Sequence, residues 1–154
     1  MTEGGVRRAV TVPVPADRAF AVFTEEMSSW WPREYTWSEE DLDAVVVEPR
    51  QGGRWFERDR DGREWEDWGR VLTWHPPRRV VLTWQISPER TAETDPARAS
   101  ELEVRFEPEG ESTRVELEHR AFDRHGRGAE AYRDGMDSPE GWTKILERYV
   151  AAAT

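Results

Sequence analysis

The stretch SPEGWTKILERYVAAA, residues 138–153, decides the fold of this sequence. Its apolar residues recur at i, i+3, i+4, i+7, i+8 and i+11, which are the intervals of an amphipathic helix. They are Trp142, Ile145, Leu146, Tyr149, Val150 and Ala153. Ser138 is a suitable N-cap, and Pro139 suits the first position of a helix. The pattern predicts a C-terminal helix of about four turns, whose apolar side needs a broad surface to cover it.

The preceding sequence supplies that surface as strands. Residues 101–107 and 115–120 alternate apolar and polar side chains, which is typical of antiparallel strands with one face in water. Residues 80–86 are apolar on both faces, so this strand is expected to be central. Strands are predicted at residues 6–14, 42–48, 80–86, 102–106 and 115–119. Two further strands are predicted next to a tight Asp61-Gly62 hairpin, one on each side of it.

Two short helices are predicted between the first and second strands, near residues 16–23 and 24–30, and Pro32 ends the second. A further helical turn is expected at 129–133. This order predicts an α+β fold: one curved antiparallel sheet wrapped around the long C-terminal helix. A chain of 154 residues is expected to form a single domain, residues 6–154, preceded by a flexible tail at 1–5.

The composition restricts the possible partners. The net charge of −10 repels phosphate, so nucleic acid and anionic membrane surfaces are not expected partners. The chain has no cysteine, which excludes disulfides, thiolate metal sites and cysteine nucleophiles. No signal peptide or apolar run of membrane-spanning length is present, so a cytoplasmic protein is expected. It is expected to be a monomer or a weak dimer.

Motifs for metals and cofactors are also missing. The three histidines do not have metal-ligand spacing, and the glycine pairs form neither a P-loop nor a dinucleotide-binding motif. We therefore expect no metal and no cofactor.

The ordered motifs resemble the helix-grip fold of START-related and Bet v 1-like (SRPBCC) proteins, and more specifically their branch similar to activators of the heat-shock-90 ATPase. The resemblance runs nearly end to end. It is carried by VTVPVPADRAFAVFT (10–24), SSWWP (28–32), GGRWFE (52–57), WGRVLTWHPPRRVVLTW (68–84), VELEHRAFDRHG (115–126) and RDGMDSPEGW (133–142).

Within that branch, WWP, GGRW, TRVELEH, FDRHG and DGMD look like the self-resistance proteins for calicheamicin, an enediyne antibiotic, in actinomycetes. The resemblance implies a non-enzymatic protein that binds an enediyne and is sacrificed by backbone cleavage in place of DNA. It places a scissile glycine near Gly110, in the PEGE turn at 108–111. Gly110 is otherwise a plain turn glycine that supplies a positive φ.

A helix-grip fold commonly leaves a pocket where the helix and sheet do not meet, so each large aromatic ring is either core or pocket wall. Trp30, Trp31 and Trp37 are expected near the mouth. Of the first two, one ring should pack under the helical insert and the other should face the pocket mouth, and the spacing favours Trp31 pointing inward. Trp68, Leu72 and Trp74 are expected to share a face. The candidate ligand-binding residues are Phe20, Phe23, Trp31, Trp37, Trp55, Trp68, Trp84, His119, Trp142, Ile145 and Tyr149.

Two other classes of function stay open. His119 is expected to point inward, either as a hydrogen-bonded core residue or as a polar anchor for the ligand, while His75 and His125 should be solvated. A polyketide cyclase-like enzyme would draw its acid–base groups from pocket side chains, and a co-chaperone-like interaction module would need none. The acid–base candidates are Glu57, Glu66, Asp67 and Asp123, although residues 58–67 most simply form a solvated hairpin.

Overall fold

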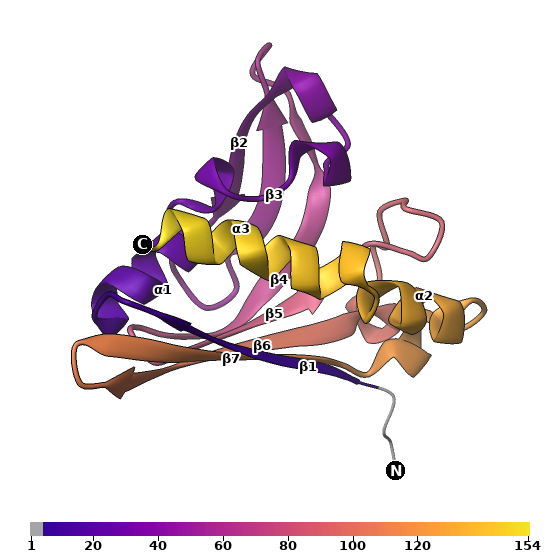
Figure 1. The fold of residues 1–154 in the computed structure, drawn as a ribbon. Coiled ribbons are helices and arrows are strands. Elements are labelled where there is room, and N and C mark those ends of the chain that lie inside the picture. The colour runs from indigo at the N-terminus through magenta and orange to yellow at the C-terminus, as the bar shows by residue number, and fades with distance from the viewer. Residues whose placement is uncertain (1–4) are drawn as a thin grey trace.

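The computed structural model describes residues 5–154, which form a seven-stranded antiparallel sheet curved around a C-terminal helix (Figure 1). The strand order is β1-β7-β6-β5-β4-β3-β2, so β5 is central, as its two apolar faces predicted. The predicted helix-grip fold is therefore confirmed. The strands are β1 (Val6–Val12), β2 (Leu42–Val47), β3 (Arg54–Asp59), β4 (Glu64–His75), β5 (Arg79–Trp84), β6 (Ser100–Glu109) and β7 (Ser112–Arg120).

Three α-helices accompany the sheet: α1 (Ala16–Thr24), α2 (Ala129–Met136) and α3 (Lys144–Ala152). In Figure 1, α3 crosses the concave side of the sheet, with α1 near its C-terminal end and α2 beyond its N-terminal end. The apolar side chains of α3 are buried against the sheet and α1, and the Tyr149 hydroxyl donates to the carbonyl of Ala19 at 2.9 Å. The helix and the inner face of the sheet therefore share one core.

The insert between β1 and β2 differs in part from its prediction. The first helix is present as α1, but the second is a single 3-10 turn, Met27–Ser29, followed by 3-10 turns at Arg33–Tyr35 and Glu39–Asp41. The Ser28 hydroxyl explains the short turn, because it donates to the Val45 carbonyl at 3.1 Å and accepts from the Val45 N–H at 2.8 Å. A serine that bonds to a neighbouring strand competes with continued helix formation.

Three irregularities in the pairing of β4 change which of its side chains face the core. The pairing shifts between Trp55 and Phe56 and between Phe56 and Arg58 on β3, and again between Val71 and Thr73 on β4. A bulge adds a residue to one strand and reverses the alternation beyond it. Trp68 and Val71 are consequently buried, whereas Leu72 is 40% exposed. The prediction that Trp68 and Leu72 share a face is therefore wrong.

The terminal helix is shorter than its side-chain pattern predicted. Regular helix begins at Lys144, and Gly141 interrupts the preceding turn, Pro139–Thr143, with φ −93° and ψ −125°. Ser138 does not cap this helix, because its hydroxyl donates instead to the carbonyl of Gly135 at 2.6 Å. A Cβ on residue 141 would lie 2.2 Å from the Met136 carbonyl oxygen. The chain therefore turns a sharp corner between α2 and α3, and only glycine fits there.

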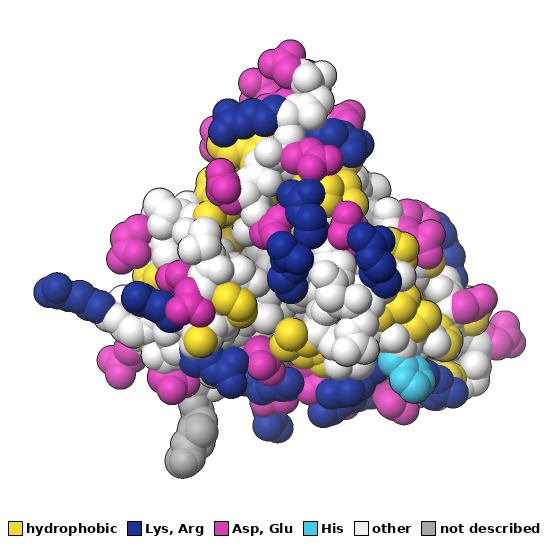
Figure 2. All heavy atoms as spheres, turned by 180° about the vertical axis from the view of Figure 1, so that it is seen from behind, with side chains coloured by type: hydrophobic (Ala, Val, Ile, Leu, Met, Phe, Trp, Pro, Cys, Tyr) yellow, Lys and Arg dark blue, Asp and Glu magenta, His cyan; other side chains and the backbone are white. Residues whose placement is uncertain are grey.

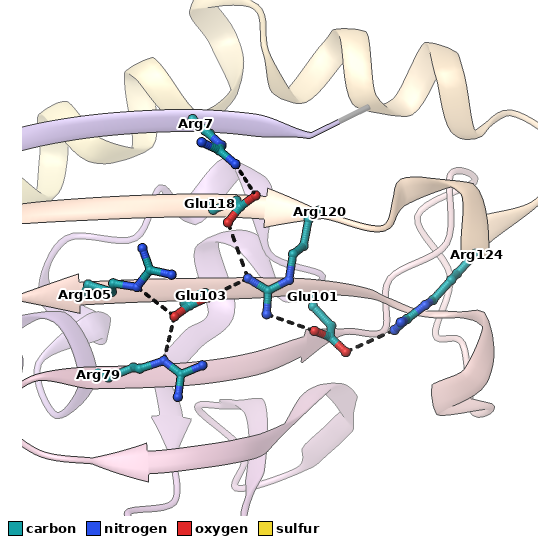
Figure 3. Close-up of polar contacts among 8 residues, drawn as sticks. All are labelled: Arg7, Arg79, Glu101, Glu103, Arg105, Glu118, Arg120 and Arg124. Atoms are coloured by element: carbon teal, nitrogen blue, oxygen red, sulfur yellow. Dashed lines mark hydrogen bonds and ion pairs between the residues drawn. The ribbon is translucent and has the colours of Figure 1, made fainter. Parts of the chain in front are cut away.

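The outer face of the sheet is covered by charged side chains of both signs. From behind, arginines and acidic residues alternate over the surface, with apolar atoms only in small patches between them (Figure 2). On β5, β6 and β7 they form a connected network centred on Glu103, whose side chain is 4% exposed and pairs with Arg79, Arg105 and Arg120 (Figure 3). One sheet thus has an ionic outer face and an apolar inner face.

The N-terminal tail and a possible membrane-spanning helix are the last features that the sequence addressed. The tail expected at 1–5 lies outside the described residues except for Gly5, which lies beside the end of β7. Between residues 5 and 154, none of the helices has the length and apolar content that crossing a bilayer requires.

Candidate functional site

A cavity of about 690 Å³ opens where α3, α2 and the end of the sheet fail to meet. Its wall comes from the 34–37 segment, the 86–90 loop after β5, α2, and the corner at 138–141. Figure 1 shows α2 beyond the N-terminal end of α3, and residues of α2 line the cavity. Four indole rings line it: Trp31, Trp37, Trp68 and Trp84.

The indole rings belong to a continuous aromatic cluster. Trp31 lies at its centre, with ring centroids 5.3 Å from Trp68 and 6.3 Å from Trp84. Behind these rings, Trp55 and Trp142 contact Trp31 at 6.1 Å each. Trp37 is further out, stacked on Trp65 at 6.5 Å. The cavity therefore has a rigid aromatic wall, because its rings are held by other buried rings.

Glu57 is the buried carboxylate of this wall. It is 0% exposed and accepts four hydrogen bonds, from the backbone N–H groups of Trp37 and Ser38, the Ser38 hydroxyl and the indole N–H of Trp68. Four donors fill the lone-pair sites of an ionised carboxylate. Glu57 therefore holds the 36–38 segment against β3 and β4, and has no free acceptor site for proton transfer.

Tyr132 forms the wall on the α2 side. Its hydroxyl accepts from the Trp84 indole N–H at 2.7 Å and donates to the Ile86 carbonyl at 2.9 Å. Burial raises the pKa of Tyr132 to about 12, although the hydrogen bond from Trp84 acts in the opposite direction. The hydroxyl stays protonated at neutral pH and fastens α2 to the end of β5.

The mouth of the cavity is formed by the 34–37 and 86–90 segments. The Trp37 indole N–H donates to the carbonyl of Arg90 at 2.8 Å, which joins the two segments. Arg90 has φ +68°, a left-handed conformation that is uncommon for residues with a side chain. Glu34, also at the mouth, pairs with Lys144 at 2.8 Å, and the pKa of this carboxyl is lowered by that hydrogen bond.

His119 points inward, as predicted, but belongs to the core rather than to the cavity wall. It is 0% exposed, its Nδ1 accepts from the Trp142 indole N–H at 3.0 Å, and its Nε2 lies 2.8 Å from the Ser100 hydroxyl. The same hydroxyl lies 2.8 Å from Nε2 of His125. His125 is 5% exposed, so the prediction that it is solvated is wrong, whereas His75 is exposed as predicted. The short Phe122–His125 turn folds His125 back onto Ser100.

The eleven predicted ligand-binding residues fall into two groups. Five line the cavity: Trp31, Trp37, Trp68, Trp84 and Ile145. Six lie in the core around it: Phe20, Phe23, Trp55, His119, Trp142 and Tyr149. The core group supports the wall; for example, the Trp55 indole N–H donates to the Met27 sulfur at 3.3 Å.

The adjacent tryptophans of the SSWWP motif have different roles. Trp30 packs under the insert, contacts Phe23 and Tyr149 at 5.1 and 5.3 Å, and donates to the Val22 carbonyl at 2.8 Å. Trp31 turns toward the sheet and forms part of the cavity wall. Both rings are buried, at 3% and 5% exposed.

The other acid–base candidates lie away from the cavity. Asp67 pairs with Arg54 and Arg70, at 2.7 and 3.0 Å, on the hairpin that residues 58–67 form. Glu66 and Asp123 are exposed. None of these three carboxylates lines the cavity with the aromatic rings.

Gly110 is also remote from the cavity. It has φ +64° in the β6–β7 turn. Trp84, in the cavity wall, pairs with Ser100 at the opposite end of β6, roughly 30 Å from Gly110 at the rise of a strand. Gly110 therefore lies far from the cavity along β6, and its scissile role stays a prediction.

The α2 side of the cavity was not predicted from the sequence. Tyr132 and Met136 line it from consecutive turns of α2, with Gly135 beside them. Their i, i+4 spacing is the one signal that the sequence offers, because residues at this interval share a helix face. Among residues 5–154, no group of three or more acidic, histidine or cysteine side chains is arranged to hold a metal ion.

The curved sheet, the helix across it and the aromatic cavity between them define the helix-grip class of proteins, whose fold indicates ligand binding. The chain belongs to the family described as "Activator of Hsp90 ATPase homolog 1-like protein", whose model matches residues 13–153. No curated protein is similar enough to the chain to add a closer comparison.

Two solved structures combine this fold with substantial sequence similarity. Txn09, an anthrahydroquino-γ-pyrone synthase solved with the ligand SUM, is 39% identical, with 96% of each chain covered and a TM-score of 0.68. CalC from Micromonospora echinospora, a self-sacrificing resistance protein, is 31% identical, with 96% of this chain and 92% of CalC covered and a TM-score of 0.65. Protein NE0264 from Nitrosomonas europaea shares the fold at 14% identity, with 97% of this chain and 93% of that chain covered and a TM-score of 0.67.

Proposed function

We propose that this protein binds a bulky, polycyclic aromatic small molecule in the cavity without transforming it. The observation that carries the proposal is the wall of four indole rings around about 690 Å³. Cavities of roughly 300–1,000 Å³ lined mainly by apolar and aromatic groups are typical small-molecule sites. Ring faces held by a rigid aromatic cluster favour a flat, hydrophobic ligand over a flexible polar one.

The two relatives narrow the class of ligand. One is named for a product with fused aromatic rings, and the other is named as a self-sacrificing resistance protein. An aromatic polyketide or an enediyne would fit the same apolar wall, and its burial would supply affinity at about 25 cal/mol for each Å² removed from water. Sequestration in the cavity would then protect the cell that contains the protein.

The state of Glu57 and Tyr132, two polar groups of the cavity wall, favours binding over acid–base catalysis. Glu57 has four donors on its two oxygens, and the Tyr132 hydroxyl is already engaged as both donor and acceptor. Neither group has the open site toward a substrate that proton transfer needs. His119 does not line the cavity.

The test titrates the protein with calicheamicin and with anthraquinone-2-sulfonate, following tryptophan fluorescence. We expect quenching, because four of the nine tryptophans line the cavity. Ala131 is exposed and lies on the cavity wall, so Ala131→Phe should obstruct the site and weaken binding by about tenfold, or ~1.4 kcal/mol.

Ala151→Phe is the matched control, since Ala151 is exposed on α3 and does not line the cavity. Equal affinities in the two variants, or no quenching by either ligand in the wild type, would contradict the proposal.

Gel analysis of the calicheamicin sample also tests whether the ligand cleaves the backbone of the protein. Gly128, Gly135 and Gly141 line the cavity, so fragments should map to 128–141 rather than to Gly110.

A second candidate function is cyclisation of a polyketide chain. The 39% identity to a synthase favours it. A cavity can accelerate ring closure by holding a flexible chain in its folded shape, with no acid–base group required. Chromatography of aromatic polyketide precursors incubated with the protein tests this function, and absence of turnover across such substrates would exclude it.

The family description raises a third candidate, stimulation of a heat-shock-90 ATPase. A pull-down with the chaperone, combined with an ATPase assay, tests it. Lack of both association and stimulation would remove this candidate.

A further inference from the structure

One positive charge at the mouth of the cavity has no counter-ion. Arg90 lines the cavity and is exposed to solvent. Within residues 5–154 its guanidinium takes part in no ion pair, and the nearby Glu93 pairs with Arg98 at 3.6 Å instead. The mouth of the cavity therefore has a cation that a ligand can reach.

The acidic side chains of the wall do not offer an equivalent charge. Glu34 and Glu140 lie 2.8 and 3.7 Å from the ammonium group of Lys144. Glu57 is buried and accepts four hydrogen bonds. Together with Arg90, these three acids are the charged residues that line the cavity. Arg90 is the one whose charge is left unpaired.

The backbone of Arg90 is held in place without its side chain. Its N–H donates to the Ser87 carbonyl at 2.8 Å, and its carbonyl accepts from the Trp37 indole at 2.8 Å. Its φ of +68° lies in the left-handed region, which glycine and asparagine adopt more readily than arginine. For the shape of this turn alone, either of those residues would be more stable. An unfavourable residue at such a position indicates a role for its side chain.

The charge of Arg90 also acts on a group inside the cavity. Burial raises the pKa of Tyr132 to about 12, while the hydrogen bond from Trp84 and the positive charge of Arg90 act in the opposite direction. Salt screens charges that are exposed to solvent beyond about 10 Å. The guanidinium therefore lies close enough to the cavity to influence a hydroxyl of the α2 wall.

We propose that Arg90 binds a carboxylate on the ligand, so that the cavity selects flat aromatic acids over neutral aromatic molecules of the same shape. The inference rests on the proposed function and adds the charge of the ligand. A guanidinium can donate two parallel hydrogen bonds to a carboxylate, while the ring system of the ligand packs on the indole wall. The net charge of −10 otherwise repels an anion, so Arg90 would supply the local attraction.

The test compares two probes of one shape, anthraquinone-2-carboxylate and anthraquinone-2-carboxamide, which differ in charge. Affinities are measured by calorimetry for the wild type, Arg90→Asn and Arg78→Asn. Arg90→Asn removes the charge but suits the left-handed backbone, and it keeps the carbonyl that accepts from Trp37. Arg78→Asn is the matched control. It removes the same charge from an exposed residue that precedes β5, whereas Trp84 ends β5, and Arg78 does not line the cavity.

We expect the wild type to prefer the carboxylate, and Arg90→Asn to reduce this preference by roughly 3- to 10-fold. That range lies between the values of an exposed ion pair and of a buried charged hydrogen bond. Arg78→Asn should keep the preference. Equal binding of both probes by the wild type, a preference that survives Arg90→Asn, or an equal loss in Arg78→Asn would overturn the inference and leave the proposed function intact. If neither probe binds the wild type, both proposals fail.

A second measurement tests whether the side chain of Arg90 serves the fold instead of the ligand. Thermal unfolding is compared for the wild type, Arg90→Asn and Arg90→Gly in the absence of ligand. Both variants should melt at or above the wild-type temperature, because both residues suit the left-handed conformation. Lower melting temperatures in both variants would contradict the inference.

Discussion

At the scale of single residues, the Trp142 indole fixes the position of the proton on His119. An indole can only donate, so Nδ1 of His119 must accept from Trp142, and Nε2 of His119 must carry the proton. Nε2 then donates to the Ser100 hydroxyl, and the same hydroxyl lies 2.8 Å from Nε2 of His125. A second proton on His119 would face the Trp142 N–H. Burial, and then the charge of His125, lower the pKa of His119 well below its usual value.

This arrangement predicts loss of stability in mild acid. Burial also lowers the pKa of His125, so below the ordinary histidine pKa of 6.5 the unfolded chain binds more protons than the folded one. The free energy of unfolding should therefore fall as the pH drops below about 6.5. The slope should approach ~1.4 kcal/mol per pH unit for each histidine that stays neutral. Denaturant titrations at pH 7.5, 6.5 and 5.5 measure it.

His75→Gln is the control for this titration, because His75 is exposed and lies outside the buried chain from Trp142 to His125. His119→Gln should reduce the slope. A wild-type stability that is the same at pH 7.5 and 5.5 would show that the buried chain accepts protons freely.

At the scale of elements, the corner between α2 and α3 shapes the cavity. The apolar pattern of residues 142–153 is helical, but the backbone leaves the helical conformation at Gly141 because α2 ends against it. This corner turns α2 toward Trp84 and Ile86, where Tyr132 fastens it. A continuous helix from Pro139 would have no such corner, and the α2 wall of the cavity depends on it.

Alanine substitutions at two glycines near this corner should therefore change the free energy of unfolding in opposite directions. In Gly141→Ala the new Cβ would lie 2.2 Å from the Met136 carbonyl oxygen, so the free energy of unfolding should decrease by about 3 kcal/mol. In Gly135→Ala the Cβ meets no atom within 4 Å, and alanine in a helix should stabilise by up to ~1 kcal/mol. Thermal unfolding monitored by circular dichroism compares the two. Similar melting temperatures would refute the steric role of Gly141.

At the scale of the whole molecule, the sheet separates charge from apolar surface. The chain carries a net charge of −10, yet the outer faces of β5, β6 and β7 carry a connected set of arginines and acids (Figure 3). Glu103 lies at its centre, 2.6 Å from Arg79, 2.9 Å from Arg105 and 2.6 Å from Arg120. Burial alone would raise the pKa of Glu103, but the hydrogen bonds from Arg79 and Arg120 and the charge of Arg105 lower it to about 2.

Glu103→Gln tests how much this network contributes. Loss of the charge leaves three arginines facing a neutral amide, so the free energy of unfolding should decrease by about 1–3 kcal/mol at neutral pH. Because the folded pKa is depressed, the contribution is present above the ordinary glutamate pKa of 4.5 and is lost as the pH falls toward 2. The wild type and the variant should therefore converge between pH 4.5 and 2. Glu109→Gln, at an exposed strand end, is the control.

The parts of the fold that could be predicted have local causes. The alternation in β6 and β7, the apolar residues on both faces of β5, and the 3.6-residue period of α3 each depend on neighbours in sequence. The β4 bulges, the 3-10 turn at Met27–Ser29 and the corner at Gly141 were not predicted. Each is imposed by another element: the paired strands, the Val45 backbone and the end of α2, respectively.

The residues of the candidate site also divide into those predictable from local spacing and those that depend on distant elements. Trp31 was expected to point inward from its spacing after the α1 residues, and the structure has it in the cavity wall. The burial of His125 and the distance of Gly110 from the cavity depended on how separate loops return to the sheet. Tyr132 was missed because a single eight-residue helix carries little periodic signal.

The sequence by itself determined that a curved sheet would enclose an amphipathic helix and a cluster of tryptophans, because apolar periodicity is a local property. Only the tertiary structure decided which four indoles face the cavity. The physical reason is that a cavity is the space that elements distant in sequence leave between them. Whether a donor finds an acceptor depends on all of those elements at once.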